Sequence, residues 1–171
     1  DRPMGAPVFK YSSLINQHNV IVLSSNYPLY ADMSNRVMTI ISNFIPDVEI
    51  YSIDEAFLKF EGYEKYDLFS YASKMRNTIL KWTGIPTSVG IAPTKSLAKI
   101  SNKIARKFPS QTKHVYVLDT DYKRSKALNY FPLNDIWGIG RRLSKRLQNI
   151  GCKNASDFVN SVSYTHLTLP T

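Results

Sequence analysis

Segments with the apolar spacing of helices alternate along this chain with shorter apolar runs that are typical of strands. Apolar residues recur every three or four positions in three stretches, which predicts amphipathic helices at 34–44, 68–82 and 95–107. Shorter runs predict strands at 48–53, 56–60, 87–91 and 114–118. Because the two kinds of segment are interleaved, we expect an α+β fold, with a helical unit added from about residue 132.

Length and composition exclude several classes of protein. A chain of 171 residues buries enough surface to need no stabilising disulfide or metal. The one cysteine, Cys152, excludes an internal disulfide framework and a paired-cysteine zinc site. The chain has no apolar run of about 18 residues and no signal-peptide layout in residues 1–10. We therefore expect a soluble protein of a reducing compartment, without a membrane partner.

The charges of the chain are numerous and unevenly distributed. The formal net charge is +9, which favours a polyanionic partner and above all nucleic acid. Residues 46–67 hold seven acidic and two basic residues, whereas 71–110 hold eight basic residues and no acidic one. A surface that only needs solubility mixes the two signs. This segregation suggests carboxylates that hold a metal and amines that hold a phosphate backbone.

Two adjacent acids, Asp54 and Glu55, lie between two of the predicted strands. Adjacent side chains of an extended strand point to opposite faces, but a turn between strands lets both reach one site. Carboxylate oxygens are suitable ligands for Mg²⁺. Spacing alone also permits an ordinary polar hairpin turn, and that interpretation is the commoner one.

Basic residues recur about every four positions along the predicted helix 95–107, at Lys95, Lys99, Lys103 and Arg106 or Lys107. Like charges at this spacing destabilise a helix by a few tenths of a kcal/mol per pair. Since the segment contains no acid, a bound phosphate would relieve the repulsion. The alternative is a solvated basic face.

A Gly-x-Gly turn near the C-terminus precedes a helix with a basic first turn. Its candidate phosphate-binding residues are Gly138, Gly140, Arg141, Arg142 and Lys145. Backbone N–H groups at the start of a helix attract phosphate, and the basic side chains add charge. The pattern predicts a helix-hairpin-helix, although an ordinary tight turn between helices has the same glycines.

Three motifs, at 51–58, 87–99 and 136–140, follow one another in the order found in Y-family, lesion-bypass DNA polymerases. The first contains Ser-Ile-Asp-Glu-Ala-Phe, and the resemblance, which covers about residues 9–159, is greatest to the UmuC branch. It implies a partial palm domain at 1–120, a mixed or antiparallel sheet with packed helices that lacks its first strand. It further implies a linker at 121–131, a partial helix-hairpin-helix thumb at 132–160, and a tail at 161–171 that is not native.

The resemblance also implies an activity, the addition of a dNTP to a primer 3′-OH opposite damaged template. Asp54 and Glu55 would be the catalytic, Mg²⁺-binding carboxylates, and Arg106 or Lys107 would contact the triphosphate. Lys95, Lys99, Lys103 and the Gly-x-Gly hairpin would face the DNA backbone. The bacterial nucleoid in the cytoplasm is the implied location, and RecA, UmuD-type subunits and a sliding clamp are the implied partners.

The chain has no residue before Asp54 that fits the family's third carboxylate, which lies on the first palm strand beside the residue that excludes ribose. We therefore expect a fragment that binds DNA weakly and does not polymerise alone. A DNA-binding module without catalysis is the rival hypothesis. A palm of the nucleotide-cyclase type would explain the carboxylates but not the Gly-x-Gly hairpin.

Overall fold

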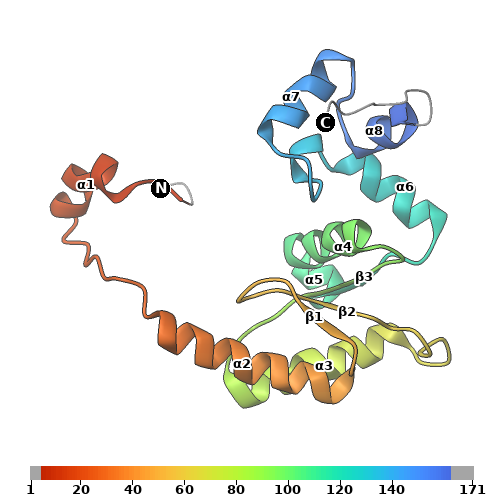
Figure 1. The fold of residues 1–171 in the computed structure, drawn as a ribbon, viewed down its shortest axis with the longest axis horizontal. Coiled ribbons are helices and arrows are strands. Elements are labelled where there is room, and N and C mark those ends of the chain that lie inside the picture. Colours follow the sequence, from red (N-terminus) through yellow and green to blue (C-terminus); the bar gives the residue numbers. More distant parts are fainter. Residues whose placement is uncertain (1–4, 163–171) are drawn as a thin grey trace.

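A computed structural model describes residues 5–162 of the chain. Their helices are η1 (Val8–Tyr11), α1 (Ser12–Gln17), α2 (Tyr27–Phe44), α3 (Leu68–Thr83), α4 (Lys95–Lys107), α5 (Pro109–Thr112), α6 (Asp121–Tyr130), η2 (Leu133–Asp135), α7 (Arg141–Asn149) and α8 (Ala155–Val162). Their strands are β1 (Val48–Ile50), β2 (Ala56–Leu58), β3 (Val89–Ile91) and β4 (Val115–Val117) (Figure 1). The predicted α+β class is confirmed.

The helices begin and end where local chemistry favours it. The Thr94 hydroxyl accepts a hydrogen bond from the Leu97 N–H and caps α4, whose bounds match the predicted 95–107. The Asp67 carboxylate accepts hydrogen bonds from the first N–H groups of α3. That helix ends at Gly84, whose φ of +72° suits glycine.

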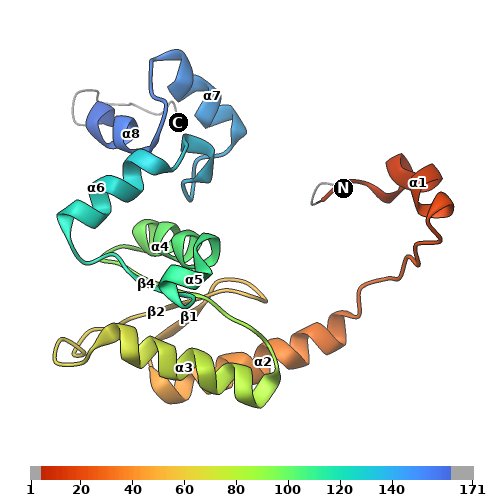
Figure 2. The same ribbon diagram turned by 180° about the vertical axis from the view of Figure 1, so that it is seen from behind.

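The strands form two small sheets. Strands β1 and β2 are antiparallel, with Val48 opposite Leu58, and β3 and β4 are parallel, with Val89 opposite Val115. Helices α2 and α3 lie along one side of the strands, and α4 lies on the other (Figures 1 and 2). The hairpin between β1 and β2 brings Asp54 and Glu55 to its tip, as the sequence predicts.

Three apolar clusters hold the described residues together. The first joins α2 to α3 through Val37, Met38, Ile40, Ile41, Met75 and Ile79. The second joins Ile100 and Leu118 to Ala127 and Phe131, which are 4% and 3% exposed. The segment predicted as a linker at 121–131 forms helix α6 and its C-cap Phe131, and its Ala127 and Phe131 share this cluster with Ile100 of α4. The third cluster, under α7, comprises Leu133, Ile139, Leu147 and Cys152.

The two ends of the described chain differ in packing. No residue of η1 or α1 is buried, and an extended segment leads from α1 to α2 (Figure 1). Ser161 and Val162, which the sequence assigns to a tail, belong to α8, and the rest of that tail, 163–171, lies outside the described residues. Within 5–162, no helix has the length and apolarity that a membrane crossing requires.

Candidate functional site

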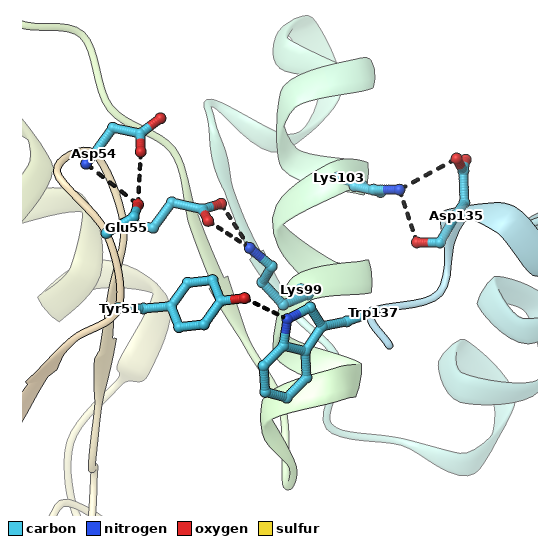
Figure 3. Close-up of polar contacts among 8 residues, drawn as sticks. Tyr51, Asp54, Glu55, Lys99, Lys103, Asp135 and Trp137 are labelled. Atoms are coloured by element: carbon cyan, nitrogen blue, oxygen red, sulfur yellow. Dashed lines mark hydrogen bonds and ion pairs between the residues drawn. The ribbon is translucent and has the colours of Figure 1, made fainter. Parts of the chain in front are cut away.

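The β1–β2 turn presents its two carboxylates differently. Asp54 is exposed, and its Oδ1 accepts a hydrogen bond of 2.6 Å from the Ser52 hydroxyl (Figure 3). Glu55 is half-buried, and its carbonyl oxygen accepts the N–H groups of Tyr51 and Ser52, each at 3.0 Å. Since these backbone bonds close the turn, both carboxylates stay at the same end of the hairpin.

Lys99 of α4 holds the Glu55 side chain. Its Nζ donates to both carboxylate oxygens, at 2.6 and 2.7 Å, and lies 5.2 Å from the centre of the Tyr51 ring (Figure 3). The two side chains are 22% and 37% exposed, so solvent and salt screen this ion pair only in part. Lys99, which the resemblance directs to the DNA backbone, thus contacts the candidate catalytic carboxylate in this structure.

Two further lysines of the basic stripe also pair with acids. Lys95 forms an ion pair with Glu49 of β1. Lys103 donates to the Asp135 carbonyl at 2.7 Å, and its Nζ lies 3.2 Å from the Asp135 carboxylate. The helix segment itself contains no acid, but the fold supplies acids from β1, the turn and η2. A phosphate would therefore have to compete with these partners for the three lysines.

A cavity of about 650 Å³ lies between α2, β2, β3 and α4. Asp54, Glu55 and Arg106 line it together, as does Lys99. Lys107 instead lies 4.8 Å from the centre of the Tyr130 ring and does not line the cavity. Of the two candidates for triphosphate binding, Arg106 thus shares the cavity with the carboxylates and Lys107 does not.

Two polar atoms in the wall of this cavity lack a partner within the described part of the chain. They are Thr87 Oγ1 and Asn102 Oδ1, both buried. Buried polar atoms are normally hydrogen-bonded, so two such atoms without a partner next to a cavity are consistent with a polar ligand or ordered water.

The Gly-x-Gly turn starts α7 without a side-chain cap. Gly138 has a φ of +89°, and Gly140 is the N-cap residue. Arg141, Arg142 and Lys145 are exposed, and no salt bridge is found for them over residues 5–162. The first N–H groups of α7 and these three cations are thus available to a phosphate, unlike the paired lysines of α4.

The carboxylate turn suits a magnesium ion only in part. The described residues include no group of three or more His, Cys, Asp or Glu side chains able to hold a metal. Mg²⁺ is often bound by one or two carboxylates together with substrate phosphates and water. The Asp54–Glu55 pair fits that donor set, provided that a substrate supplies further oxygens.

Sequence reasoning missed the contacts between the turn and distant elements. Glu49 and Asp135, two of the three acids that pair with lysines of α4, are 46 and 32 residues from their partners. Trp137 and Tyr51, 86 residues apart, also form a hydrogen bond (Figure 3). Both aromatic residues lie inside the motifs, but no spacing pattern indicates that they meet.

Solved structures define the class of this fold. The chain is similar to the insertion ternary complex of Dbh DNA polymerase, with a TM-score of 0.75 and 29% identity over 93% of this chain and 45% of that one. It resembles equally a DinB-family error-prone DNA polymerase from Sulfolobus solfataricus, with a TM-score of 0.74, 29% identity and coverage of 93% and 46%. The fold is that of a Y-family DNA polymerase, of which the chain spans less than half.

Sequence relatives give the family. The impB/mucB/samB family matches residues 3–103, and the chain belongs to it. Protein UmuC of Salmonella typhimurium is 46% identical, over 90% of this chain and 36% of that protein. DNA polymerase IV of Picrophilus torridus is 33% identical, over 91% of this chain and 43% of that protein. The chain therefore spans little more than a third of UmuC.

Proposed function

We propose that this chain is part of a translesion DNA polymerase, which adds dNTPs to a primer 3′-OH opposite damaged template. The observation that carries the proposal is the cavity that two acidic residues, Asp54 and Glu55, line together with Arg106. Carboxylates suit a divalent cation and a guanidinium suits a phosphate, which are the needs of nucleotidyl transfer. The relatives named DNA polymerase support the same activity.

Each candidate residue has a role in this proposal. Asp54 and Glu55 would hold Mg²⁺, which when bound stabilises charge on the attacking and leaving oxygens. Arg106 would bind the triphosphate through its forked donors. The N–H groups at Gly138 and Gly140 would hold the DNA backbone, together with the exposed cations Arg141, Arg142 and Lys145, and with Lys95, Lys99 and Lys103 once these exchange their carboxylate partners.

The remaining parts of the proposal come from the family. A third carboxylate would be contributed by the rest of the polymerase, since only two acids line the cavity among the described residues. The palm at 1–120 and the thumb at 132–160 would be joined by helix α6. Primer-template DNA and dNTP would be the substrates. RecA, UmuD-type subunits and a sliding clamp would be partners at the bacterial nucleoid.

Primer extension by the full-length protein tests this function. With Mg²⁺, four dNTPs and a primer annealed to a template with an abasic site, we expect extension past the lesion. Binding of the primer-template without any extension, on damaged or undamaged template, would contradict the proposal and support a DNA-binding module without catalysis. The 171-residue chain alone should bind DNA weakly and should not extend the primer.

A further inference from the structure

Trp137 lies beside the apolar core of its own unit without joining it. That core comprises Leu133, Ile139, Leu147 and Cys152, with Ile136, Leu143 and Phe158 packed against it. Trp137 instead reaches the β1–β2 hairpin and remains 37% exposed. Trp137 therefore contributes to the contact between its own unit and the β1–β2 hairpin, and not to the core of its own unit.

The contact combines a hydrogen bond with ring packing. The indole Nε1–H donates to the Tyr51 hydroxyl oxygen at 3.1 Å (Figure 3). The Trp137 ring centre lies 5.7 Å from that of Tyr51, at an interplanar angle of 82°, and 5.5 Å from that of Phe57. The edge-to-face arrangement of Trp137 and Tyr51 at this separation is attractive, and the hydrogen bond adds a preferred direction.

Tyr51 connects this contact to Glu55. Its backbone N–H donates to the Glu55 carbonyl, which closes the carboxylate turn. Its ring lies against the Lys99 ammonium group, which in turn holds the Glu55 carboxylate. Trp137 therefore contacts Tyr51, whose backbone N–H and ring both help to orient Glu55, the candidate catalytic residue.

On the other side, Trp137 is joined directly to the Gly-x-Gly turn. Gly138 follows it with a φ of +89°, and α7 begins at Arg141. Asp135, two positions earlier, is held by Lys103 of α4. The segment before the turn is thus attached twice, to the β1–β2 hairpin that carries the carboxylates and to α4, whose Lys99 holds the Glu55 carboxylate.

We propose that Trp137 is a positioning residue that fixes the Gly-x-Gly hairpin relative to Glu55 through its bond to Tyr51. The inference rests on the proposed function, because it concerns the distance between DNA held at the hairpin and the site of nucleotidyl transfer. Reaction rates depend steeply on that geometry, since a displacement of about 1 Å can lower a rate about 100-fold. Trp137 acts through Tyr51 and does not touch the DNA.

The test uses Trp137→Phe, Tyr51→Phe and the double variant in the full-length protein. Each variant keeps an aromatic ring and removes the N–H···O bond. In single-turnover incorporation at saturating DNA and dNTP, we expect each single variant to lose rate by about three- to tenfold, as for one hydrogen bond. The double variant should be no slower than the singles, since all three lack the same bond. DNA affinity should stay unchanged.

Trp82→Phe is the matched control, because Trp82 is exposed on α3 and should leave the rate unaffected. Multiplied losses in the double variant, an unchanged rate, or a loss confined to DNA affinity would each overturn the positioning role.

Fluorine NMR of the 5-fluorotryptophan-labelled protein gives a readout independent of catalysis. Tyr51→Phe should shift the signal that Trp137→Phe removes, and an unmoved signal would overturn the contact. If Tyr51→Phe shifts the Trp137 signal but the wild-type protein extends no primer, the contact stands and the proposed function is contradicted.

Discussion

Glu55 has a cationic partner in Lys99 before any substrate is present. The bidentate contact of 2.6 and 2.7 Å occupies both oxygens of a carboxylate that we assign to metal binding. A lysine so placed holds the side chain in one orientation and also repels a divalent cation. The same residue therefore favours order at the site and weakens its affinity for the metal.

Replacing Lys99 should tighten the apparent binding of magnesium. In the full-length protein, Lys99→Met should lower the Mg²⁺ concentration for half-maximal primer extension by about three- to tenfold, as expected from one partly screened charge. Lys99→Arg keeps the charge and should leave the Mg²⁺ requirement near that of the wild type. A magnesium titration of the extension rate measures this, and an unchanged or raised requirement for Lys99→Met would contradict the assignment.

At this scale the sequence predicted candidate residues but not their contacts. Asp54 and Glu55 were predicted from the first motif, and Arg106 or Lys107 from the family resemblance, because residue type and order are local properties of the chain. Their surroundings depend on pairs such as Lys103 with Asp135, 32 residues apart, which only the folded chain brings together. The Tyr130 contact that separates Lys107 from Arg106 is likewise a property of the folded chain.

Strand β3 and helix α4 approach one another closely at Gly90. A Cβ atom at this position would lie 2.1 Å from the Asn102 backbone N and 2.5 Å from the Ala98 carbonyl oxygen. Both neighbours are backbone atoms of α4, so neither can turn aside. Because Gly90 has no side chain, α4, which carries the lysines and Arg106, can pack this closely against β3.

Gly90→Ala should destabilise the protein strongly. We expect the free energy of unfolding to fall by about 3 kcal/mol, at the upper end for an overpacked site, because α4 must shift as a whole. Gly140→Ala is the matched control, since nothing lies within 4 Å of its Cβ and its φ is −77°. Urea unfolding measures both, and equal stability of the two variants would contradict the close approach.

The start of α3 should depend on pH. Hydrogen bonds from the Ser70 hydroxyl and from the Ser70 and Phe69 N–H groups hold the pKa of Asp67 below its ordinary value. A lowered folded-state pKa contributes stability above the pKa of the unfolded chain, and this is lost as the pH falls through the folded pKa. We expect the amides of Phe69 and Ser70 to be less protected under those acidic conditions, when their exchange is compared with the intrinsic rate at the same pH.

Asp67→Asn separates this effect from general acid unfolding. Asparagine is a good N-cap residue that does not titrate in this range, so the variant should keep a pH-independent helix start. The same acid-dependent exchange in wild type and variant would contradict the role of the Asp67 carboxylate.

Helix α4 was predicted more closely than the strands for a physical reason, whereas the helix predicted at 34–44 begins seven residues earlier, at Tyr27. Helix α4 has its cap, its apolar face and the following proline within one segment, so its bounds were correct. The predicted strands 48–53 and 56–60 shorten to Val48–Ile50 and Ala56–Leu58, because a strand extends only as far as a neighbour pairs with it. The apolar pattern of one strand does not show where its partner strand ends.

Over the whole molecule, charges that are segregated along the chain are partly neutralised in space. Lys95, Lys99 and Lys103 of α4 pair with acids of other elements, whereas the cations after Gly140 stay unpaired among the described residues. The net charge of +9 therefore overstates how much positive surface α4 offers, and the hairpin is the stronger candidate for the first contact with DNA.

The salt dependence of DNA binding should distinguish these cations. Each phosphate contact contributes about −0.9 to the slope of log affinity against log salt for duplex DNA. We expect Arg141→Gln to reduce the slope of the full-length protein by about one. Arg36→Gln, which removes an exposed cation paired with Asp32 on α2, should leave the slope unchanged. Equal slopes for wild type and Arg141→Gln would remove Arg141 from the DNA contacts.

The central claim is that the β1–β2 turn carries catalytic carboxylates, and single-nucleotide incorporation by the full-length Asp54→Ala variant tests it most directly. We predict that incorporation falls by about 10²–10³-fold or more while primer-template binding is retained, because the lost group acts on developing charge. Asp47→Ala removes an exposed acid near the same hairpin and should leave the rate unchanged. Incorporation by Asp54→Ala within about threefold of the wild-type rate would contradict the account.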